Sequence, residues 1–295
     1  MQKRGGKGNL GMKIHIKDFI KNIILVSNNY FIFFLTKKGK CFFLKISNIP
    51  KGNKLFKGRA IQNLIKINKN DKIKSYLLIK NFKKKKYIKS HYVIIITKKG
   101  IIKKTLLSKY SKFRNNKLNA IKIKKNDYLL DAKLTNGNNQ ILIATKYGKC
   151  IRFNEKKIKL TNRNSIGVKS IKIKNKKDKV IGMLNIKLND NNKYILVVSE
   201  NGYGKCSNLK DYRITNRRVV GIKTINITKK TGKLIAIKKV KKDDDIIIIK
   251  KSGLNIRISI KSIRITSRNS QGVKLIKLIN KDKIADIEII KKIKK

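Results

Sequence analysis

Short apolar runs alternate along this chain with polar turns that contain glycine. The runs are four or five residues long and rich in isoleucine, valine, leucine and phenylalanine. Runs of this length between turn residues are typical of buried β-strands rather than of helices. Glycine in the turn suits a hairpin in which one residue has positive φ. Strands are therefore predicted at residues 31–35, 93–96, 141–144, 195–198 and 246–249, followed by turns at Gly39, Gly100, Gly148, Gly202 and Gly253.

The hairpins recur with a period of about fifty residues, which indicates a repeat architecture. In three repeats a second glycine stands 19 residues after the turn glycine and ends an Arg-x-x-x-Gly segment, at residues 163–167, 217–221 and 268–272. Repeated strand–turn–strand units predict an all-β, propeller-like ring of four-stranded blades. The longest interval holds the lysine-rich residues 83–89, which we expect to form an exposed loop. A large apolar or aromatic residue follows each turn glycine by ten positions, as Ile49, Tyr110, Ile158, Tyr212 or Ile263.

A fourth Arg-x-x-x-Gly segment, at residues 4–8, opens the chain without a hairpin before it. The chain thus holds five full repeats and the second half of a sixth. This predicts a first blade that is incomplete at the N-terminus. A chain of 295 residues could form one closed ring or two ordinary domains. The repeats favour a single domain over residues 1–295.

The positive net charge of the chain indicates a polyanionic binding partner. Lys and Arg number 78 against 15 Asp and Glu, so the net charge is +63, and such a chain attracts polyanions strongly. Lysine, isoleucine and asparagine all have AT-rich codons, so codon bias accounts for part of the lysine excess. Arginine is scarcer, and four arginines occupy the one repeated position. One cation per blade, spaced evenly around a disc, suggests a surface that bends DNA around itself.

Other chemistry is not indicated by the sequence. There is no nucleophile–base pair, carboxylate dyad, P-loop or cofactor fingerprint, so we expect no enzyme activity from this chain alone. The three cysteines are far apart and are expected to be small apolar side chains inside blades. The acidic triplet at 243–245 is interpreted as an exposed turn and not as a metal site. No apolar stretch approaches the ~20 residues of a membrane span and no secretory signal is present, so a cytoplasmic location is expected.

Residues 2–8 read Gln-Lys-Arg-Gly-Gly-Lys-Gly and resemble the gyrase A box, a motif of the C-terminal domain of the A subunit of bacterial DNA gyrase. The resemblance covers almost the whole chain, because residues 61–64, 100–105, 201–205 and 267–272 look like further landmarks of that family. It implies a six-bladed β-pinwheel, a propeller relative in which blades exchange strands with their neighbours. It also implies that the domain wraps DNA around its basic rim with positive handedness, which the holoenzyme uses for ATP-dependent negative supercoiling.

The expected DNA contacts follow from the repeated position and from the box. Arg4, Arg163, Arg217 and Arg268 are each expected to meet a phosphate, with Arg218 beside Arg217 and Arg114 in the degenerate second repeat. In the box, Lys3 and Lys7 would raise the positive potential, and Gly5, Gly6 and Gly8 would let backbone N–H groups approach a phosphate closely, next to Gln2. The alternative for the repeated segment is a purely structural corner, in which arginine caps carbonyl groups and glycine makes the turn.

The resemblance also implies the partners. They are double-stranded DNA, the B subunit of gyrase and the N-terminal part of its A subunit in an A2B2 holoenzyme, without a membrane. No cofactor is expected on this chain, since ATP and Mg²⁺ would bind the partner subunits. Two alternatives stay open: the C-terminal domain of a topoisomerase IV subunit, and a basic propeller that serves as a scaffold for protein interactions. The intact box and the number of repeats favour gyrase over topoisomerase IV.

Overall fold

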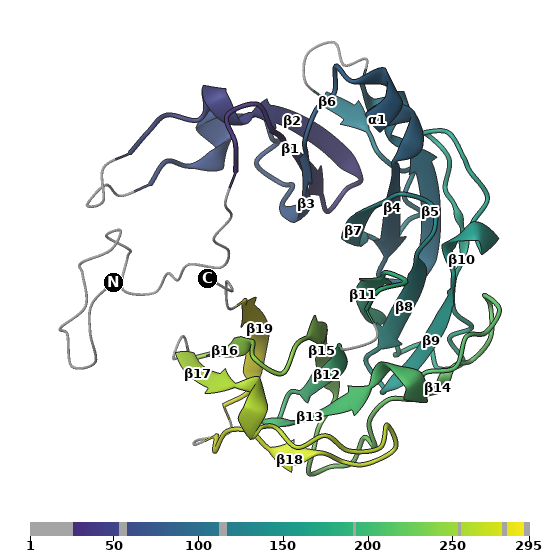
Figure 1. The fold of residues 1–295 in the computed structure, drawn as a ribbon, viewed down its shortest axis with the longest axis vertical. Coiled ribbons are helices and arrows are strands. Elements are labelled where there is room, and N and C mark those ends of the chain that lie inside the picture. The colour runs from purple at the N-terminus through teal and green to yellow at the C-terminus, as the bar shows by residue number, and fades with distance from the viewer. Residues whose placement is uncertain are drawn as a thin grey trace.

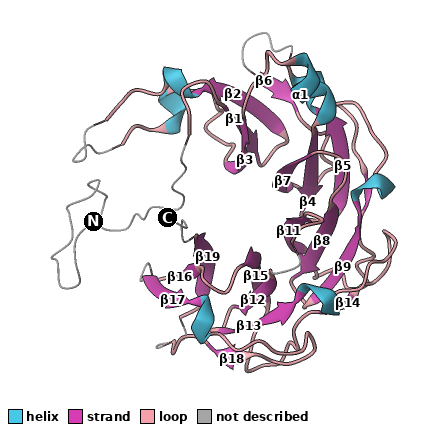
Figure 2. Cartoon of the chain, in the orientation of Figure 1, coloured by secondary structure: helices cyan, strands magenta, loops and turns pink. Residues whose placement is uncertain are grey.

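Five small antiparallel sheets stand side by side in an arc, like the blades of a propeller (Figure 1). The computed structural model describes residues 26–52, 58–111, 117–190, 193–252, 255–278 and 282–291. Figure 2 shows that strands dominate this part of the chain and that the helices are few and short. The prediction of an all-β, propeller-like fold is confirmed.

The third blade shows how each sheet is assembled. Its centre is the hairpin of β8 (Gln140–Thr145) and β9 (Lys149–Asn154). On the side of β8, the strand β11 (Val180–Ile186) pairs along its length and lines the inside of the arc. On the side of β9, the outer strand β14 (Ile222–Lys223) comes from the next repeat. The blade is therefore completed by a short strand of the repeat that follows it.

The other blades repeat this order with one exception. Within the described residues, the fourth strand is present in four sheets, whereas the fifth sheet has three strands, in the order β17-β16-β19. The remaining strands are β1 (Phe31–Thr36), β2 (Lys40–Lys45), β3 (Ile73–Ile79) and β6 (Lys117–Asn119) in the first blade; β4 (Tyr92–Thr97), β5 (Ile101–Leu106), β7 (Leu129–Thr135) and β10 (Val168–Lys169) in the second; β12 (Tyr194–Ser199), β13 (Tyr203–Asn208), β15 (Leu234–Val240) and β18 (Val273–Lys274) in the fourth; and β16 (Asp245–Lys250), β17 (Asn255–Ser259) and β19 (Ile284–Ile290) in the fifth.

In the part of the chain that the structure describes, helical segments lie in the links between strands. One turn of 3₁₀-helix follows the second hairpin strand of each blade, and a further one lies in the first repeat. These are η1 (Ile46–Asn48), η2 (Ile61–Asn63), η3 (Leu107–Tyr110), η4 (Glu155–Lys157), η5 (Leu209–Asp211) and η6 (Ile260–Ser262). The expectation of an exposed loop at 83–89 is only partly right: residues 83–86 and 89 are exposed, but α1 (Lys85–Ser90) forms there instead of a loop. It forms because Ile88 is buried and Tyr87 half-buried in the core that the first two blades share.

The core lies between neighbouring blades. On β4, Val93 and Ile95 pack toward the first blade, whereas Ile94 and Ile96 pack toward the third. Successive side chains of a strand point to opposite faces, so a strand buried on both faces reads as a continuous apolar run. This explains the uninterrupted runs in the sequence. The position ten residues after the turn glycine is buried in four blades, at Tyr110, Ile158, Tyr212 and Ile263, whereas Ile49 in the first blade is partly buried.

The blade count differs from the expected six. The described residues form five blades, because the half repeat that predicted another lies in residues 1–25, outside the described residues. The turn glycines behave as predicted at Gly39, Gly100, Gly148 and Gly202, where φ lies between 73 and 86°. Gly253 lies outside the described residues.

Candidate nucleic-acid interface

The Arg-x-x-x-Gly segments form corners on the outer edge of the blades. Each corner glycine has positive φ: 96° at Gly167, 83° at Gly221 and 80° at Gly272. A Cβ atom at these positions would lie 2.5–2.6 Å from a carbonyl oxygen of the hairpin strand in the preceding blade. Glycine is therefore required twice over, by the backbone conformation and by the close approach. The interpretation of glycine as the residue that makes the turn is confirmed.

Successive corners are joined by backbone hydrogen bonds. The N–H groups of Lys122, Lys172 and Asn226 donate to carbonyl groups of the next corner, with N···O distances of 3.2, 2.9 and 3.2 Å. The acceptors are Ser165, Val219 and Ser270. Residues 117–122, 162–172, 216–226 and 267–276 thus form one continuous structure, the corner band, along the outside of four blades (Figure 1).

The repeated arginines brace this band. Arg217 donates from Nε to the Lys157 carbonyl at 2.7 Å and from Nη1 to the Lys169 carbonyl at 2.9 Å. Arg268 donates from Nη1 to the Lys223 carbonyl at 2.9 Å. These bonds support the structural alternative, in which arginine caps carbonyl groups. A guanidinium has five N–H donors, so each arginine keeps donors beyond those bonds to backbone carbonyls.

The remaining predicted contacts fall into two groups. Arg163 is half-buried at the same register as Arg217 and Arg268, whereas Arg218 is exposed. Arg218 adopts φ of 67°, unusual for a residue with a side chain, while its N–H donates to the Ser170 carbonyl at 2.7 Å. The other group lies outside the described residues: Gln2, Lys3, Arg4, Gly5, Gly6, Lys7, Gly8 and Arg114.

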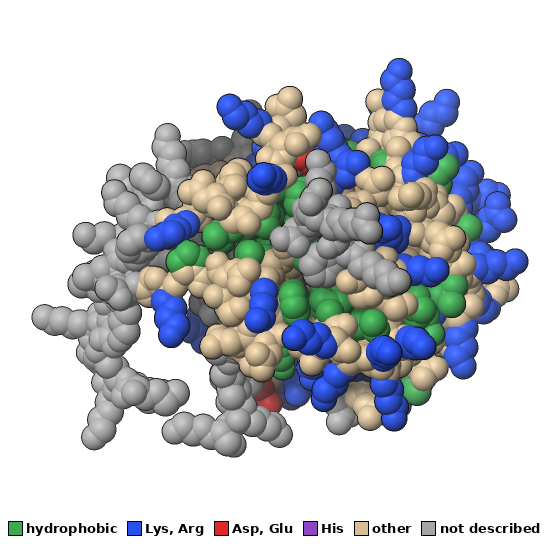
Figure 3. All heavy atoms as spheres, turned by 90° about the horizontal axis from the view of Figure 1, so that it is seen from above, with side chains coloured by type: hydrophobic (Ala, Val, Ile, Leu, Met, Phe, Trp, Pro, Cys, Tyr) green, Lys and Arg blue, Asp and Glu red, His purple; other side chains and the backbone are tan. Residues whose placement is uncertain are grey.

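Lysines of the outer strands add charge to the band. Lys169 on β10, Lys223 on β14 and Lys274 on β18 are equivalent in the repeat, and all three side chains are exposed. Seen edge-on, the side of the molecule in view carries many lysine and arginine side chains and very few acidic ones (Figure 3).

Several of the acidic residues are used locally by the fold. Asp71, Asp127 and Asp178 accept hydrogen bonds from N–H groups of the hairpin turns, at 3.0–3.1 Å. Glu155 is fully buried and pairs with Lys104 at 3.2 Å. Asp190 is buried between Lys193 and Lys239. Carboxylates tied up in this way leave most of the surface lysines without counter-charge.

The acidic triplet at 243–245 is only partly the exposed turn that was expected. Asp243 is exposed and pairs with Lys261, whereas Asp244 and Asp245 are buried. Asp244 accepts from the Lys241 N–H at 2.8 Å, and Asp245 accepts from Arg257. Across the described stretches of the chain, no three His, Cys, Asp or Glu side chains are grouped as a metal site would need.

Among the described residues, two buried lysines that form no ion pair were not predicted as site residues. Lys103 on β5 and Lys205 on β13 are 1 % and 0 % exposed, and both reach into the corner band from beneath. Their register is the signal that could have found them, because each is the third residue after a turn glycine, a position that is apolar in the other three repeats.

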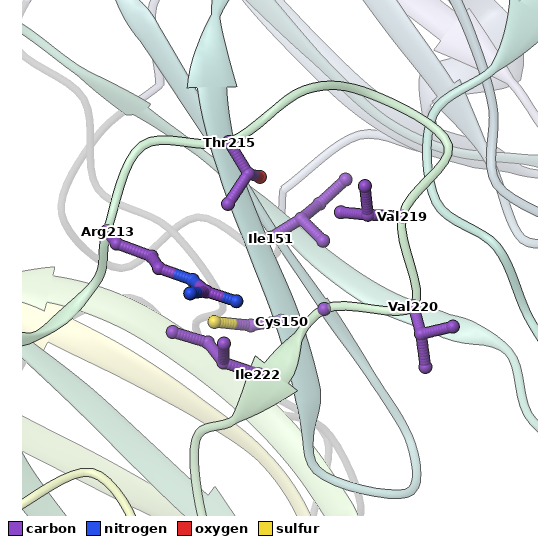
Figure 4. A pocket seen from close by; sticks show the side chains of 8 residues that line it. Cys150, Ile151, Arg213, Thr215, Val219, Val220 and Ile222 are labelled. Atoms are coloured by element: carbon purple, nitrogen blue, oxygen red, sulfur yellow. The ribbon is translucent and has the colours of Figure 1, made fainter.

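At the same register the third blade has Ile151. There a cavity of about 220 Å³ opens under the corner at 216–222. Ile151, Thr215, Val219 and Gly221 line it, and Arg213 points in beside Cys150 (Figure 4).

Comparison with known proteins assigns the family. The family described as DNA gyrase C-terminal domain, beta-propeller, matches residues 30–79, 91–136, 139–187, 193–241 and 244–291. Each match covers the hairpin and the inner strand of one blade. No helix in the described stretches of the chain is long and apolar enough to cross a bilayer.

Individual relatives are consistent with this family match. The A subunit of DNA gyrase from Buchnera aphidicola subsp. Baizongia pistaciae is 36% identical over 287 residues, which are 97% of this chain and 33% of that protein. The A subunit of DNA gyrase from Staphylococcus epidermidis is 34% identical over 277 residues, 94% of this chain and 30% of that protein. The chain spans about a third of the length of these relatives.

Solved structures share the fold. The C-terminal domain of DNA topoisomerase IV superposes with a TM-score of 0.82 at 20% identity, over 94% of this chain and 84% of that one. The DNA gyrase A C-terminal domain superposes with a TM-score of 0.73 at 22% identity, over 90% of this chain and 83% of that one. The repeats, the corners and these sequence matches lead to one conclusion: the chain belongs to the family of DNA gyrase C-terminal domains, built as a β-propeller.

Proposed function

We propose that this chain binds double-stranded DNA along the corner band and wraps it around the outside of the arc, as the C-terminal domain of a DNA gyrase A subunit. The observation that carries the proposal is the band itself, one continuous outer edge with an exposed lysine at the same place in three successive blades. The function is that of a single DNA-wrapping unit without catalytic activity of its own.

Phosphate contacts supply the free energy of binding in this proposal. Bending 20–30 bp by 40–90° costs about 1–6 kcal/mol, so wrapping needs many favourable contacts. Release of counterions from DNA provides them without reading bases, and log K falls with log salt at a slope of about −0.9 per phosphate neutralised. Binding is therefore tolerant of DNA sequence and steeply dependent on salt.

The partners follow from the relatives, which are A subunits of DNA gyrase. In the holoenzyme that we propose, DNA cleavage belongs to the N-terminal part of the A subunit. ATP and Mg²⁺ bind the partner subunits, including the B subunit, while this chain holds no cofactor. The seven box residues at 2–8 and Arg114 would add further DNA contacts to those of the described corners.

A topological assay tests the wrapping. The protein is mixed with nicked plasmid at low salt, the plasmid is ligated, and the linking number is measured after protein removal. We expect a positive shift that grows with protein concentration. Replacing Lys169, Lys223 and Lys274 together by glutamine should abolish most of the shift, because these exposed side chains lie on the band and, unlike Arg217, do not brace it.

A matched triple variant serves as the control. Lys80, Lys187 and Lys241 are also exposed, but each directly follows an inner strand, β3, β11 or β15. Their replacement by glutamine removes the same charge away from the band and should leave the shift in place. Equal losses in the two variants, or DNA binding without any shift, would favour general adhesion of a basic scaffold to DNA and reject wrapping.

A further inference from the structure

Lys103 and Lys205 are charged side chains placed beneath the outer edge of two blades. Each is the third residue after a turn glycine, Gly100 or Gly202. Lys103 Nζ donates to the Ala120 carbonyl at 2.8 Å and to the Arg163 carbonyl. Lys205 Nζ donates to the Ser267 carbonyl and to Ser270 Oγ, the latter at 3.1 Å. All four acceptors belong to the corner band.

Neither ammonium group makes an ion pair with a described residue, although lysine is rarely this buried without one. Burial, together with the nearby Arg163 cation, lowers the pKa of Lys103 to about 7. Burial likewise lowers the pKa of Lys205 to about 8, with Arg268 adding to this effect and Asp211 opposing it. The protonated, charged forms of both lysines are therefore destabilised in the free protein.

The fold does not require lysine at this register. The equivalent residue is Phe42 in the first blade, Ile151 in the third and Ile256 in the fifth. Ile151 lies under the corner at 216–222, and the cavity of about 220 Å³ lies beside its side chain (Figure 4). The comparison within one molecule shows that an apolar side chain supports a blade and that lysine adds bonds to the corner.

We propose that Lys103 and Lys205 are positioning residues that hold two corners from beneath. They also supply a positive charge behind the path of the DNA phosphates, so this proposal rests on the proposed DNA binding. A phosphate on the corner stabilises the charged form of the lysine below it. Binding of DNA then draws a proton onto each lysine, so the protein has its full affinity only where these groups are protonated.

The ionisable groups around the two lysines do not change charge near pH 7, so the lysines account for the pH dependence. Around Lys103 these are Arg163, Cys41 on β2, and Tyr110, whose hydroxyl donates to the same Ala120 carbonyl at 3.3 Å. Burial raises the pKa of both the Cys41 thiol and the Tyr110 hydroxyl, so both stay neutral near pH 7. Around Lys205 the charged groups are Arg268 and Asp211.

The sign of the pH dependence follows from linkage. A lysine with a low pKa in the free protein and a higher pKa in the complex favours binding at low pH. The affinity then falls as pH rises through the free-protein values of about 7 and about 8. One unit of difference between the two states corresponds to a tenfold change in Kd per lysine.

The test compares Lys103→Met, Lys205→Met and the double variant with Ile151→Met, which changes the same register without changing charge. Binding to a short mixed-sequence duplex is measured across salt concentrations and from pH 6 to pH 9. We expect the wild type to weaken as pH rises, and the double variant to bind more weakly at low pH with a flatter pH profile. Its salt slope should be smaller by about one per lysine.

A reverse variant keeps the test decisive if a methionine variant is unstable. Ile151→Lys places an ammonium group under the corner at 216–222 and should raise affinity at low pH while steepening the pH profile. Thermal unfolding of every variant separates folding defects from binding defects. Unchanged pH profiles and salt slopes in folded variants that still wrap DNA would overturn this inference alone. A wild type that fails to shift the linking number would instead overturn the proposed function.

Discussion

Gly167, Gly221 and Gly272 close their corners where a side chain would meet a backbone carbonyl of the preceding blade. The sequence predicted this much, because an arginine and a glycine at fixed spacing indicate a turn that is used repeatedly. It could not decide what the arginine does. The acceptors of Arg217 and Arg268 on the outer strands lie 48 and 45 residues away, so those bonds depend on the packing of one repeat on the previous one.

Replacing a corner glycine should therefore destabilise the free protein. Gly221→Ala puts a Cβ atom 2.5 Å from the Cys150 carbonyl oxygen at a φ of 83°. We expect a loss of about 1–3 kcal/mol in the free energy of unfolding, since a non-glycine residue is strained in that region. Denaturant unfolding measures the loss. The neighbouring Val219→Ala, at an exposed side chain, should change stability by less than about 0.5 kcal/mol. Similar values for the two variants would contradict the strained corner.

Hairpins were predictable at the scale of the element, whereas the exchanged strands were not. A run such as that of β12 carries its own signal, because both faces are buried and the turn glycine follows. The strands β10, β14 and β18 are two residues long and have no periodicity to detect. Only the resemblance to a known family implied strand exchange. The helix α1 was not predicted for a related reason. It is short, and the lysines at 83–89 leave no apolar pattern that would indicate the buried Ile88.

The link between the second and third blades is expected to depend on Glu155. Its carboxylate is fully buried, pairs with Lys104 on β5 at 3.2 Å and accepts from the Asn139 N–H at 2.7 Å. Removal of one partner of a buried pair leaves the other charge uncompensated. We expect Glu155→Ala to lower the free energy of unfolding by about 3–5 kcal/mol.

A double variant distinguishes the charged pair from the hydrogen bonds around it. Glu155→Gln combined with Lys104→Met keeps an acceptor for Asn139 and removes both charges, so it should lose less stability than Glu155→Ala. Asp243→Ala breaks the exposed pair with Lys261 and should cost no more than about 1 kcal/mol. A small loss for Glu155→Ala, comparable to that of Asp243→Ala, would show that the buried pair does not stabilise the link.

On the scale of the whole molecule, the sequence predicted the ring-like arrangement and the sign of its charge, and it predicted one blade more than the described residues form. The arrangement follows from a repeat that cannot bury both faces of its sheet alone. The lysine-rich surface follows from composition. What composition does not reveal is where the charge is concentrated, because that depends on which lysines the corners bring to the outer edge.

A net charge of +63 should make the free protein and its DNA complex respond to salt in opposite directions. Salt screens repulsion among surface charges over a Debye length of about 10 Å at 0.1 M, so added potassium chloride should raise the Tm of the free protein. The same salt should weaken DNA binding. Thermal unfolding with and without salt checks the first part, and an uncharged osmolyte controls for exclusion effects. A Tm that falls with salt would mean that attractive pairs outweigh the repulsion.

The strand that each repeat lends to the blade before it has a consequence for how such chains evolve. Duplication of any stretch of one repeat length inserts a hairpin together with the strand that the preceding hairpin needs. The junctions on both sides therefore remain fully paired wherever the duplication starts. Repeats could thus be gained or lost by unequal recombination without an intermediate that exposes a new internal edge, and under the proposed function each change would alter the length of the DNA path.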